Sequence, residues 1–325
     1  MNSGRIWITW EIQRRNRTLS ARLGSTLNEL IFKGNRFLRY PALIARTAAL
    51  IAKKRPSILF VQNPSIVLAL FAVSSKFIFR SPVVVDAHNA GIFPFEGKKP
   101  WANRVTGFIL RNADLTIVTN PSLAGHVSAA GGRPFALPDP LPEIRRQKTA
   151  RPLKGRRNVL FICTYAEDEP YLEVIKAASM LAPDIFVYIS GNPKGREKAF
   201  SHLLAPNTVL TGYLPEDDYI GLFNSVDAVV DLTTREDCLV CGAYEAVTLE
   251  KPMVLSDTKA LRDYFSNGAL FTDNTAGDLA GKIMEALENA DILSERAKRL
   301  KETLAANWEE MKDRLEKTLR EIEKK

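Results

Sequence analysis

Residues 228–252 read AVVDLTTREDCLVCGAYEAVTLEKP. An apolar run, 228–231, leads into a polar loop, and a helical pattern opens near Cys241 and Gly242. A short β-branched strand followed by a loop and a helix is the repeating unit of α/β folds, in which helices cover a parallel sheet. The free N–H groups and the dipole at the start of such a helix attract phosphate. This stretch therefore predicts a buried strand, an anion-binding loop and a helix in succession.

The same alternation of short apolar runs and longer helical patterns continues along the chain. Further strands are expected at 5–9, 57–61, 83–86, 115–119, 158–162, 185–189, 208–210 and 253–256. Helices are expected at 43–53, 66–79, 171–181, 216–224, 242–249 and 279–289, with a helical tail at 295–325. Asn63 and Pro64 are typical of a helix start, the Asn as its cap. We predict an α/β fold of two doubly wound Rossmann-like domains facing a cleft, with ligands beyond the carboxyl ends of the strands.

The net charge of the 325-residue chain changes sign within a proline-rich linker, residues 137–157. Residues 1–148 carry 22 Lys and Arg against 7 Asp and Glu, whereas residues 149–325 carry 23 against 30. We expect one domain at 1–148, a second at 149–302, and a helix at 303–325 that returns to the first. A basic domain can meet an anionic membrane, a phosphorylated substrate or nucleic acid, although such charge also serves solubility.

The cysteine content and the apolar stretches bear on the compartment. Three cysteines, Cys163, Cys238 and Cys241, are too few for a disulfide framework, which favours a reducing compartment. The first residues lack a signal-peptide pattern, and the most apolar stretch, 66–79, is shorter than the ~20 residues that span a bilayer. We expect a cytoplasmic protein that could touch the cytoplasmic face of a membrane. The lone CxxC pair is a weak metal or redox signal, and no metal site is expected.

The stretch around Asp237 and Glu245 resembles the nucleotide-sugar site of GT-B glycosyltransferases, especially those of family 4. Their signature is an acidic residue, seven intervening residues and then a Glu, as here, although Asp replaces the usual Glu and Glu250 replaces a usual Gly. The resemblance implies that Asp237 contacts the donor sugar and that Glu245 binds the ribose hydroxyls. It also implies that the diphosphate lies against the residues at the helix start, Val240, Cys241 and Gly242. Independently of the resemblance, Arg235 lies next to this loop and could add a charge-assisted contact.

The resemblance continues on both sides of this signature. The segment 211–232 matches the part that precedes it, so Gly212 and Tyr213 are expected against the base. The sequence SGNPKG at 190–195 resembles the glycine loop of the donor domain, and Gly191 is a donor-binding candidate. The segments VQNPSIVLALFAV and VVVDAHNAG resemble the acceptor domain of β-mannosyltransferases that act on lipid-linked chitobiose. The helix around Trp308 resembles the terminal helix that crosses back onto the first domain.

The chain departs from the family pattern after the first strand of each domain. Residues 163–171, CTYAEDEPY, lack the Arg and Lys that usually grip the diphosphate, so the stereochemical outcome, retaining or inverting, stays open. Lys194 and Arg196 could supply that charge, and Thr164 is a further donor-binding candidate. Residues 10–17, WEIQRRNR, replace a Gly-rich turn. The cations of this segment could meet an anionic acceptor or form a solvated helix face: Arg14, Arg15 and Arg17.

Two groups at expected strand ends are candidates for catalysis. His88 directly follows a strand and could bind the donor sugar or stabilise charge during transfer, and Glu11 could act as an acid or base. Asn89 is an acceptor-binding candidate, whereas Asp86 is expected to make a structural hydrogen bond.

Together these features predict a metal-independent hexosyltransferase that uses a nucleotide diphosphate sugar as co-substrate, with no other cofactor. Its acceptor is expected to be a glycan or a lipid-linked molecule of cell-envelope polysaccharide or glycolipid synthesis, and the basic domain could contact an anionic membrane. The alternatives are a non-catalytic nucleotide-sugar-binding subunit and a sugar-nucleotide epimerase. Binding of nucleic acid by the basic half has only the charge in its favour, and no nucleic-acid partner is expected.

Overall fold

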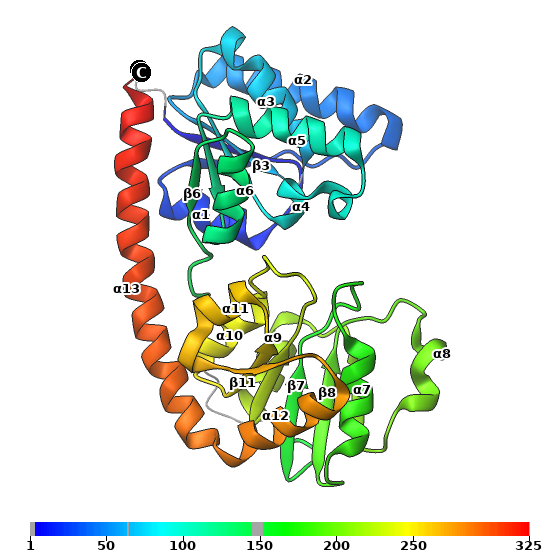
Figure 1. Cartoon of the computed structure of the whole chain (residues 1–325). Helices are drawn as coiled ribbons and strands as arrows, with labels where there is room; N and C mark the ends of the chain where they lie inside the picture. Colours follow the sequence, from blue (N-terminus) through cyan, green and yellow to red (C-terminus); the bar gives the residue numbers. More distant parts are fainter. Residues whose placement is uncertain (1–3, 64, 145–151, 325) are drawn as a thin grey trace. The chain divides into compact units, whose positions relative to one another are not determined.

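The computed structural model describes residues 4–63, 65–144 and 152–324. The chain divides into two compact units, which we call unit 1 (Met1–Pro140 with Asn307–Lys325) and unit 2 (Leu141–Ala306) (Figure 1). The predicted boundary at 148/149 lies outside the described residues, as do residues 145–151 of the predicted linker. The predicted boundary at 302/303 lies inside helix α13 (Ala290–Glu323), which contributes residues to both units.

In the described part of unit 1, a parallel sheet of six strands has the order β2-β1-β3-β4-β5-β6. The strands are β1 (Ile6–Thr9), β2 (Thr26–Glu29), β3 (Leu59–Asn63), β4 (Val83–Ala87), β5 (Leu115–Val118) and β6 (Pro134–Ala136). The helices are α1 (Arg14–Arg22), α2 (Arg36–Lys54), α3 (Ile66–Phe79), α4 (Asn89–Ile92), the 3₁₀ turn η1 (Pro94–Gly97), α5 (Pro100–Asn112) and α6 (Pro121–Ala129).

Alternate residues of these strands face two separate apolar layers, as the two-residue period of a strand requires. One layer lies against α2, α3, α5 and α6 and includes Ile8, Val61 and Val85. The other includes Trp7, whose ring stacks on Phe60 with centroids 5.1 Å apart, and it packs against α1 and the end of α13. Both faces of the sheet are therefore covered, which explains why its central strands read as continuous apolar runs.

The described part of unit 2 contains a second parallel sheet of six strands, in the order β12-β11-β10-β7-β8-β9. The strands are β7 (Arg157–Phe161), β8 (Ile185–Ser190), β9 (Thr208–Gly212), β10 (Ala228–Asp231), β11 (Met253–Ser256) and β12 (Leu270–Thr272). The helices are α7 (Tyr171–Met180), α8 (Glu197–Phe200), α9 (Glu216–Ser225), α10 (Cys241–Leu249), α11 (Lys259–Phe265) and α12 (Ala276–Glu288), with 3₁₀ turns η2 (Ser201–Leu203) and η3 (Ser266–Gly268).

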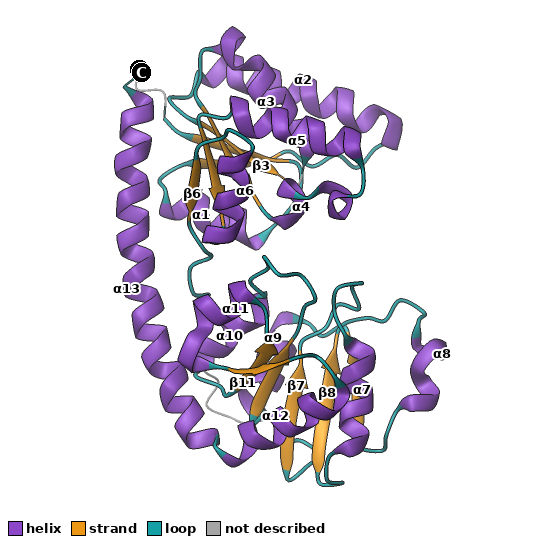
Figure 2. Ribbon diagram, in the orientation of Figure 1, coloured by secondary structure: helices purple, strands orange, loops and turns teal. Residues whose placement is uncertain are grey.

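Helices cover both faces of this sheet too. Helices α7 and α12 pack on one face, and α9, α10 and α11 pack on the other (Figure 2). The expectation of two doubly wound Rossmann-like α/β domains is thus confirmed, and the architecture is the GT-B fold. Within the described residues, no helix combines the length and the apolarity that spanning a bilayer requires.

Several details differ from the sequence-based expectations: α2 begins at Arg36 rather than at residue 43, and α5 and α11 were not expected. Asn63 does not cap a helix: it ends β3, and α3 begins at Ile66 with Ser65 as its N-cap. Pro64 lies outside the described residues. Three short strands were not expected, β2, β6 and β12, and most of their residues are only half-buried. Such strands carry too few apolar residues to give a clear signal.

Candidate functional site

The loops that follow β7, β8 and β9 meet at the carboxyl edge of the unit 2 sheet. Gly191 has a φ of +86°, and a Cβ on it would lie 2.0 Å from the carbonyl oxygen of Cys163, so only glycine fits there. Gly191 also forms an isolated bridge with Gly212. The structure therefore brings together three predicted donor-binding positions: the loop of Thr164, Gly191 and Gly212. Tyr213, next in sequence, is 80% exposed.

Helix α10 begins against the end of β10, and glycine is required at the point of contact. A Cβ on Gly242 would lie 2.1 Å from Cδ1 of Ile162 and 2.6 Å from Oδ2 of Asp231. Val240 is the buried N-cap of the helix, and Cys241 is exposed at its first position. The predicted anion-binding residues thus lie at a helix start, and the glycine serves the close approach of the chain's own carboxyl group.

Asp231 is a buried acidic group that the sequence reasoning missed. Its side chain is 6% exposed, and Oδ2 has no hydrogen-bond partner among the described residues. Burial raises the pKa of this carboxyl well above its usual range, and the charges of Glu169 and Glu245 raise it further. Hydrogen bonds from the backbone N–H groups of Gly242 and Ala243 lower the pKa but do not outweigh burial. Asp231 therefore holds its proton far more tightly than an exposed Asp.

Glu245 lies in the second turn of α10 and is held by a residue of α9. The hydroxyl of Tyr219 donates a hydrogen bond of 2.7 Å to Oε2 of Glu245. Burial, together with the charge of Glu245, raises the pKa of Tyr219, so the phenol stays protonated and remains a donor. The predicted ribose-binding carboxylate is therefore oriented by a partner 26 residues earlier in the chain.

The acidic loop after β7 folds around its own carboxylate. Glu169 accepts hydrogen bonds from the backbone N–H and hydroxyl of Thr164, each of 2.8 Å, and from the backbone N–H of Ala166, of 3.0 Å. Burial, reinforced by the charge of Glu169, raises the pKa of the Cys163 thiol. The loop that usually carries cations in the resembling family thus carries an anion that occupies its own N–H donors.

The candidate cations of unit 2 differ in their surroundings. Nη2 of Arg235 lies 3.3 Å from Oδ1 of Asp168, and Nη1 of Arg196 donates a hydrogen bond to the carbonyl oxygen of Tyr165. Both arginines therefore reach back to the acidic loop. Lys194 is exposed with a φ of +54°. Asp237, the predicted sugar contact, is half-buried in the loop before α10.

Unit 1 contains a buried ion pair that the sequence reasoning interpreted differently. Nη2 of Arg15 lies 2.8 Å from Oδ1 of Asp86, and Nη1 lies 2.7 Å from Oδ1 of Asp139. Burial opposes the charge of Asp86, but Arg15, helped by His88, outweighs it and holds the pKa of Asp86 well below its usual range. Arg15 was expected on an acceptor-facing or solvated surface. It is only 7% exposed and serves instead as the counter-ion of Asp86, which does make the expected structural contact.

The other acceptor-side candidates lie at or near the carboxyl ends of β1 and β4. His88 directly follows β4, and its Nε2 lies 3.6 Å from Oδ2 of Asp86. Asn89 begins α4. Glu11 is exposed, with Oε1 3.7 Å from Nη2 of Arg39. Strand β3 lies between β1 and β4, so the carboxyl ends of β1 and β4 are about 10 Å apart.

The remaining arginines of this segment are exposed. Nε of Arg17 lies 2.9 Å from Oε1 of Glu29 at the end of β2, and Arg14 begins α1. Across the described residues, no group of three His, Cys, Asp or Glu side chains is arranged to hold a metal ion.

Comparisons with known proteins extend these observations. Residues 143–305 match the family model described as glycosyl transferases group 1, and residues 13–136 match a glycosyl transferase 4-like domain. No curated protein sequence matches the chain.

Several solved structures share the fold at low sequence identity. The Anabaena protein Alr3699/HepE in complex with UDP-glucose is 15% identical, with a TM-score of 0.73 over 95% of this chain and 90% of that one. The lipopolysaccharide outer core galactosyltransferase WaaB is 12% identical, with a TM-score of 0.61 over 92% and 96%. A putative UDP-N-acetylglucosamine 2-epimerase from Listeria monocytogenes is 14% identical, with a TM-score of 0.61 over 91% of each chain.

Proposed function

The chain belongs to the glycosyl transferases group 1 family, and we propose that it transfers a sugar from a UDP-linked donor, held by unit 2, to an acceptor held by unit 1. The observation that carries this proposal is the start of α10, where a helix N-terminus, a required glycine and the oriented carboxylate of Glu245 occur together. UDP is proposed as the nucleotide because the related fold of HepE binds UDP-glucose.

The donor is proposed to lie along the carboxyl edge of the unit 2 sheet. A carboxylate can accept hydrogen bonds from two vicinal hydroxyls, so Glu245 binds the ribose while Asp237 contacts the sugar. Backbone N–H groups at the start of α10 and nearby cations bind the diphosphate, and loop residues complete the site: Val240, Cys241, Gly242, Arg235, Lys194, Thr164, Gly191, Gly212 and Tyr213.

A protonated Asp231 favours binding of an anion at this helix. An ionised carboxylate at the start of α10 would neutralise the positive end of the helix dipole and repel a diphosphate. Burial raises the pKa of Asp231 and so favours the neutral carboxyl over the carboxylate, and a neutral carboxyl leaves the helix N-terminus its attraction for negative charge. The same attraction stabilises the leaving UDP as its charge develops.

The acceptor is proposed to bind at the carboxyl edge of the unit 1 sheet. His88 is placed to stabilise charge during transfer, with Glu11 as acid or base, and Asn89, Arg14 and Arg17 as acceptor contacts. We propose a glycan or lipid-linked acceptor of envelope polysaccharide or glycolipid synthesis, and this proposal rests only on the likeness inferred from the sequence of residues 61–73 and 83–91. The basic charge of residues 1–148 favours an acceptor presented at the cytoplasmic face of an anionic membrane.

A thermal-shift screen against UDP, GDP, dTDP and ADP, with and without magnesium, tests the donor site. UDP should raise the melting temperature without magnesium. Glu245→Ala should weaken UDP binding by about tenfold or more, because hydrogen bonds to a charged group are lost. Glu288→Ala, an exposed glutamate of α12, is the matched control and should bind UDP normally. The absence of a shift with any nucleotide would sink the donor-site proposal.

A non-catalytic nucleotide-sugar-binding subunit is the second candidate, and the acidic loop after β7 is the observation that favours it. Glu169 occupies the N–H donors of that loop, and Asp168 engages Arg235. An epimerase of the same fold is a weaker candidate, since the Listeria neighbour at 14% identity supports the fold alone. Measuring UDP release from UDP-sugars, with and without lipid-linked acceptors, separates the candidates. Binding with no turnover would favour the subunit.

A further inference from the structure

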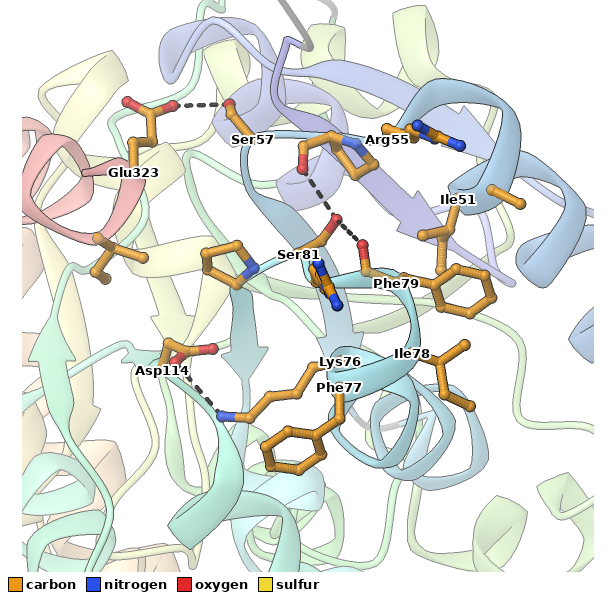
Figure 3. Close-up of a pocket in the computed structure, with 15 residues that line it drawn as sticks. Ile51, Arg55, Ser57, Lys76, Phe77, Ile78, Phe79, Ser81, Asp114 and Glu323 are labelled. Atoms are coloured by element: carbon orange, nitrogen blue, oxygen red, sulfur yellow. Dashed lines mark hydrogen bonds and ion pairs between the residues drawn. The ribbon is translucent and has the colours of Figure 1, made fainter. Parts of the chain in front are cut away.

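Unit 1 has an open cavity of about 920 Å³ at the amino ends of its central strands. The cavity lies between the C-terminal ends of α2 and α3, next to the end of α13. Figure 3 shows side chains from these elements gathered around it. Ser57 precedes β3, Ser81 precedes β4 and Asp114 precedes β5, so this edge of the sheet is opposite to the one that bears His88. The cavity is therefore separate from the proposed transfer site.

The carboxylates of the cavity are paired within the chain. Nζ of Lys76 lies 3.4 Å from Oδ1 of Asp114 and also donates a hydrogen bond to the carbonyl oxygen of Asn112. Oε1 of Glu323 lies 3.0 Å from Nε of Arg5 and also accepts a hydrogen bond from Ser57. Each carboxylate already has a cationic partner within the chain, so neither gives the cavity an unpaired negative charge.

Two arginines of the cavity are exposed and lack such partners. Among the described residues, no hydrogen bond or ion pair holds the side chain of Arg55 or Arg80. Each is the C-cap residue of its helix, α2 or α3, and each has a left-handed backbone, with φ of 44° and 52°. Glycine is the residue most favoured at such positions. A helix C-terminus attracts a cation, which explains one arginine at the C-terminal end of α2 and one at that of α3. It does not explain the apolar surface beside the two arginines.

That apolar surface consists of two residues in the last turn of α3. Phe77 is 76% exposed and Ile78 is 78% exposed, and both line the cavity. Lys53 and Lys54 are exposed at the end of α2 beside it. Large apolar side chains flanked by exposed cations are typical of surfaces that lie in the boundary between headgroups and acyl chains of an anionic membrane.

We propose that this cavity binds the phosphate headgroup of an anionic phospholipid, with Arg55 and Arg80 as the phosphate contacts. Phe77 and Ile78 then enter the acyl-chain boundary. The inference deepens the proposed function, since it identifies the surface that would hold the enzyme where a lipid-linked acceptor is presented. It does not depend on which nucleotide or sugar unit 2 binds.

Co-sedimentation of the full chain with vesicles tests the proposal. The protein should bind vesicles of phosphatidylcholine mixed with phosphatidylglycerol and should not bind phosphatidylcholine alone. The variant Arg55→Gly/Arg80→Gly should bind about thirty-fold more weakly. It should melt no lower than the parent, because glycine suits both left-handed positions. Phe77→Ser/Ile78→Ser should also lose vesicle binding.

Matched controls remove the same charge or the same kind of apolar surface from unit 2. Arg296→Gln/Lys298→Gln and Met284→Ser/Ile292→Ser change exposed residues there and should bind vesicles normally. Equal binding to phosphatidylcholine alone, equal losses in a control, or unchanged binding of the arginine variant would overturn the proposal. So would stabilisation by inorganic phosphate, lost in the arginine variant, without vesicle binding.

The same variants separate this proposal from that of the donor site. Arg55→Gly/Arg80→Gly should leave the thermal shift by UDP in solution unchanged. Vesicle binding without any nucleotide shift would contradict the donor site alone, whereas a nucleotide shift without vesicle binding would contradict the lipid site alone.

Discussion

Asp86 in unit 1 and Asp231 in unit 2 lie near the carboxyl ends of interior strands of their sheets, and both are buried. Asp86 faces a buried arginine, and its pKa is lowered. Asp231 faces the start of a helix without a cation, and its pKa is raised. The same side chain at a similar depth is therefore biased toward its charged form in one unit and toward its protonated form in the other.

The difference shows what each sheet edge is prepared to receive. A buried charge must be compensated, and in unit 1 the chain supplies that compensation through Arg15, which is also bound to Asp139. In unit 2 burial disfavours a negative charge on Asp231 at the helix N-terminus, so an external anion can provide that charge. Substitutions at the carboxyl edge of the unit 1 sheet and at that of the unit 2 sheet should therefore have different effects.

Replacing Arg15 with Met should have the largest effect, because it leaves the charge of Asp86 buried without a partner. The free energy of unfolding should fall by about 3–5 kcal/mol. All four tryptophans of the chain lie in unit 1, so tryptophan fluorescence during urea denaturation follows that unit. Adding Asp86→Asn should recover part of the loss, because the uncompensated charge is removed.

The exposed pair of Arg17 and Glu29 is the control for this substitution. Arg17→Met removes the same kind of side chain three residues from the start of α1, where solvent screens the charge. It should leave the fluorescence transition nearly unchanged. An equal fall in the free energy of unfolding for both arginine variants would mean that the buried ion pair stabilises unit 1 no more than the exposed pair does.

Gly242→Ala should have the next largest effect, and it acts on unit 2. The added Cβ would meet Ile162 and Asp231, and forced contacts of this kind cost about 1–3 kcal/mol. Far-UV circular dichroism should show the loss while the tryptophan transition stays in place. Gly281→Ala, in the interior of α12, is the control and should be neutral or stabilising, because the new Cβ would have no atom within 4 Å apart from its chain neighbours and the backbone of its own helix.

The sequence predicts the elements with strong local patterns and misses those set by distant contacts. The strands 228–231 and 253–256 were predicted with the bounds observed for β10 and β11. The short edge strands were missed because half-buried residues give little periodicity.

The same limit applies to the candidate site. The resemblance to the family signature singled out Gly242 and Glu245 on one helix. It could not find Tyr219, which meets Glu245 only because α9 packs beside α10. It likewise misplaced Arg15, whose cluster resembles a solvated helix face, because its partner Asp86 is 71 residues away.

The smallest effect, and the most direct test of the comparison, is the pH dependence of stability. The lowered pKa of Asp86 contributes stability that is present above its unfolded value of about 3.9 and is lost as the pH falls through the folded value. The raised pKa of Asp231 contributes stability that is present below that unfolded value and is lost as the pH rises through the folded value. Asp86→Asn should flatten the acid loss seen by tryptophan fluorescence. Asp231→Asn should flatten the loss at rising pH seen by circular dichroism. If Asp231→Asn left that slope unchanged, Asp231 would be ionised at neutral pH, and the helix start of unit 2 would carry its own counter-charge as unit 1 does.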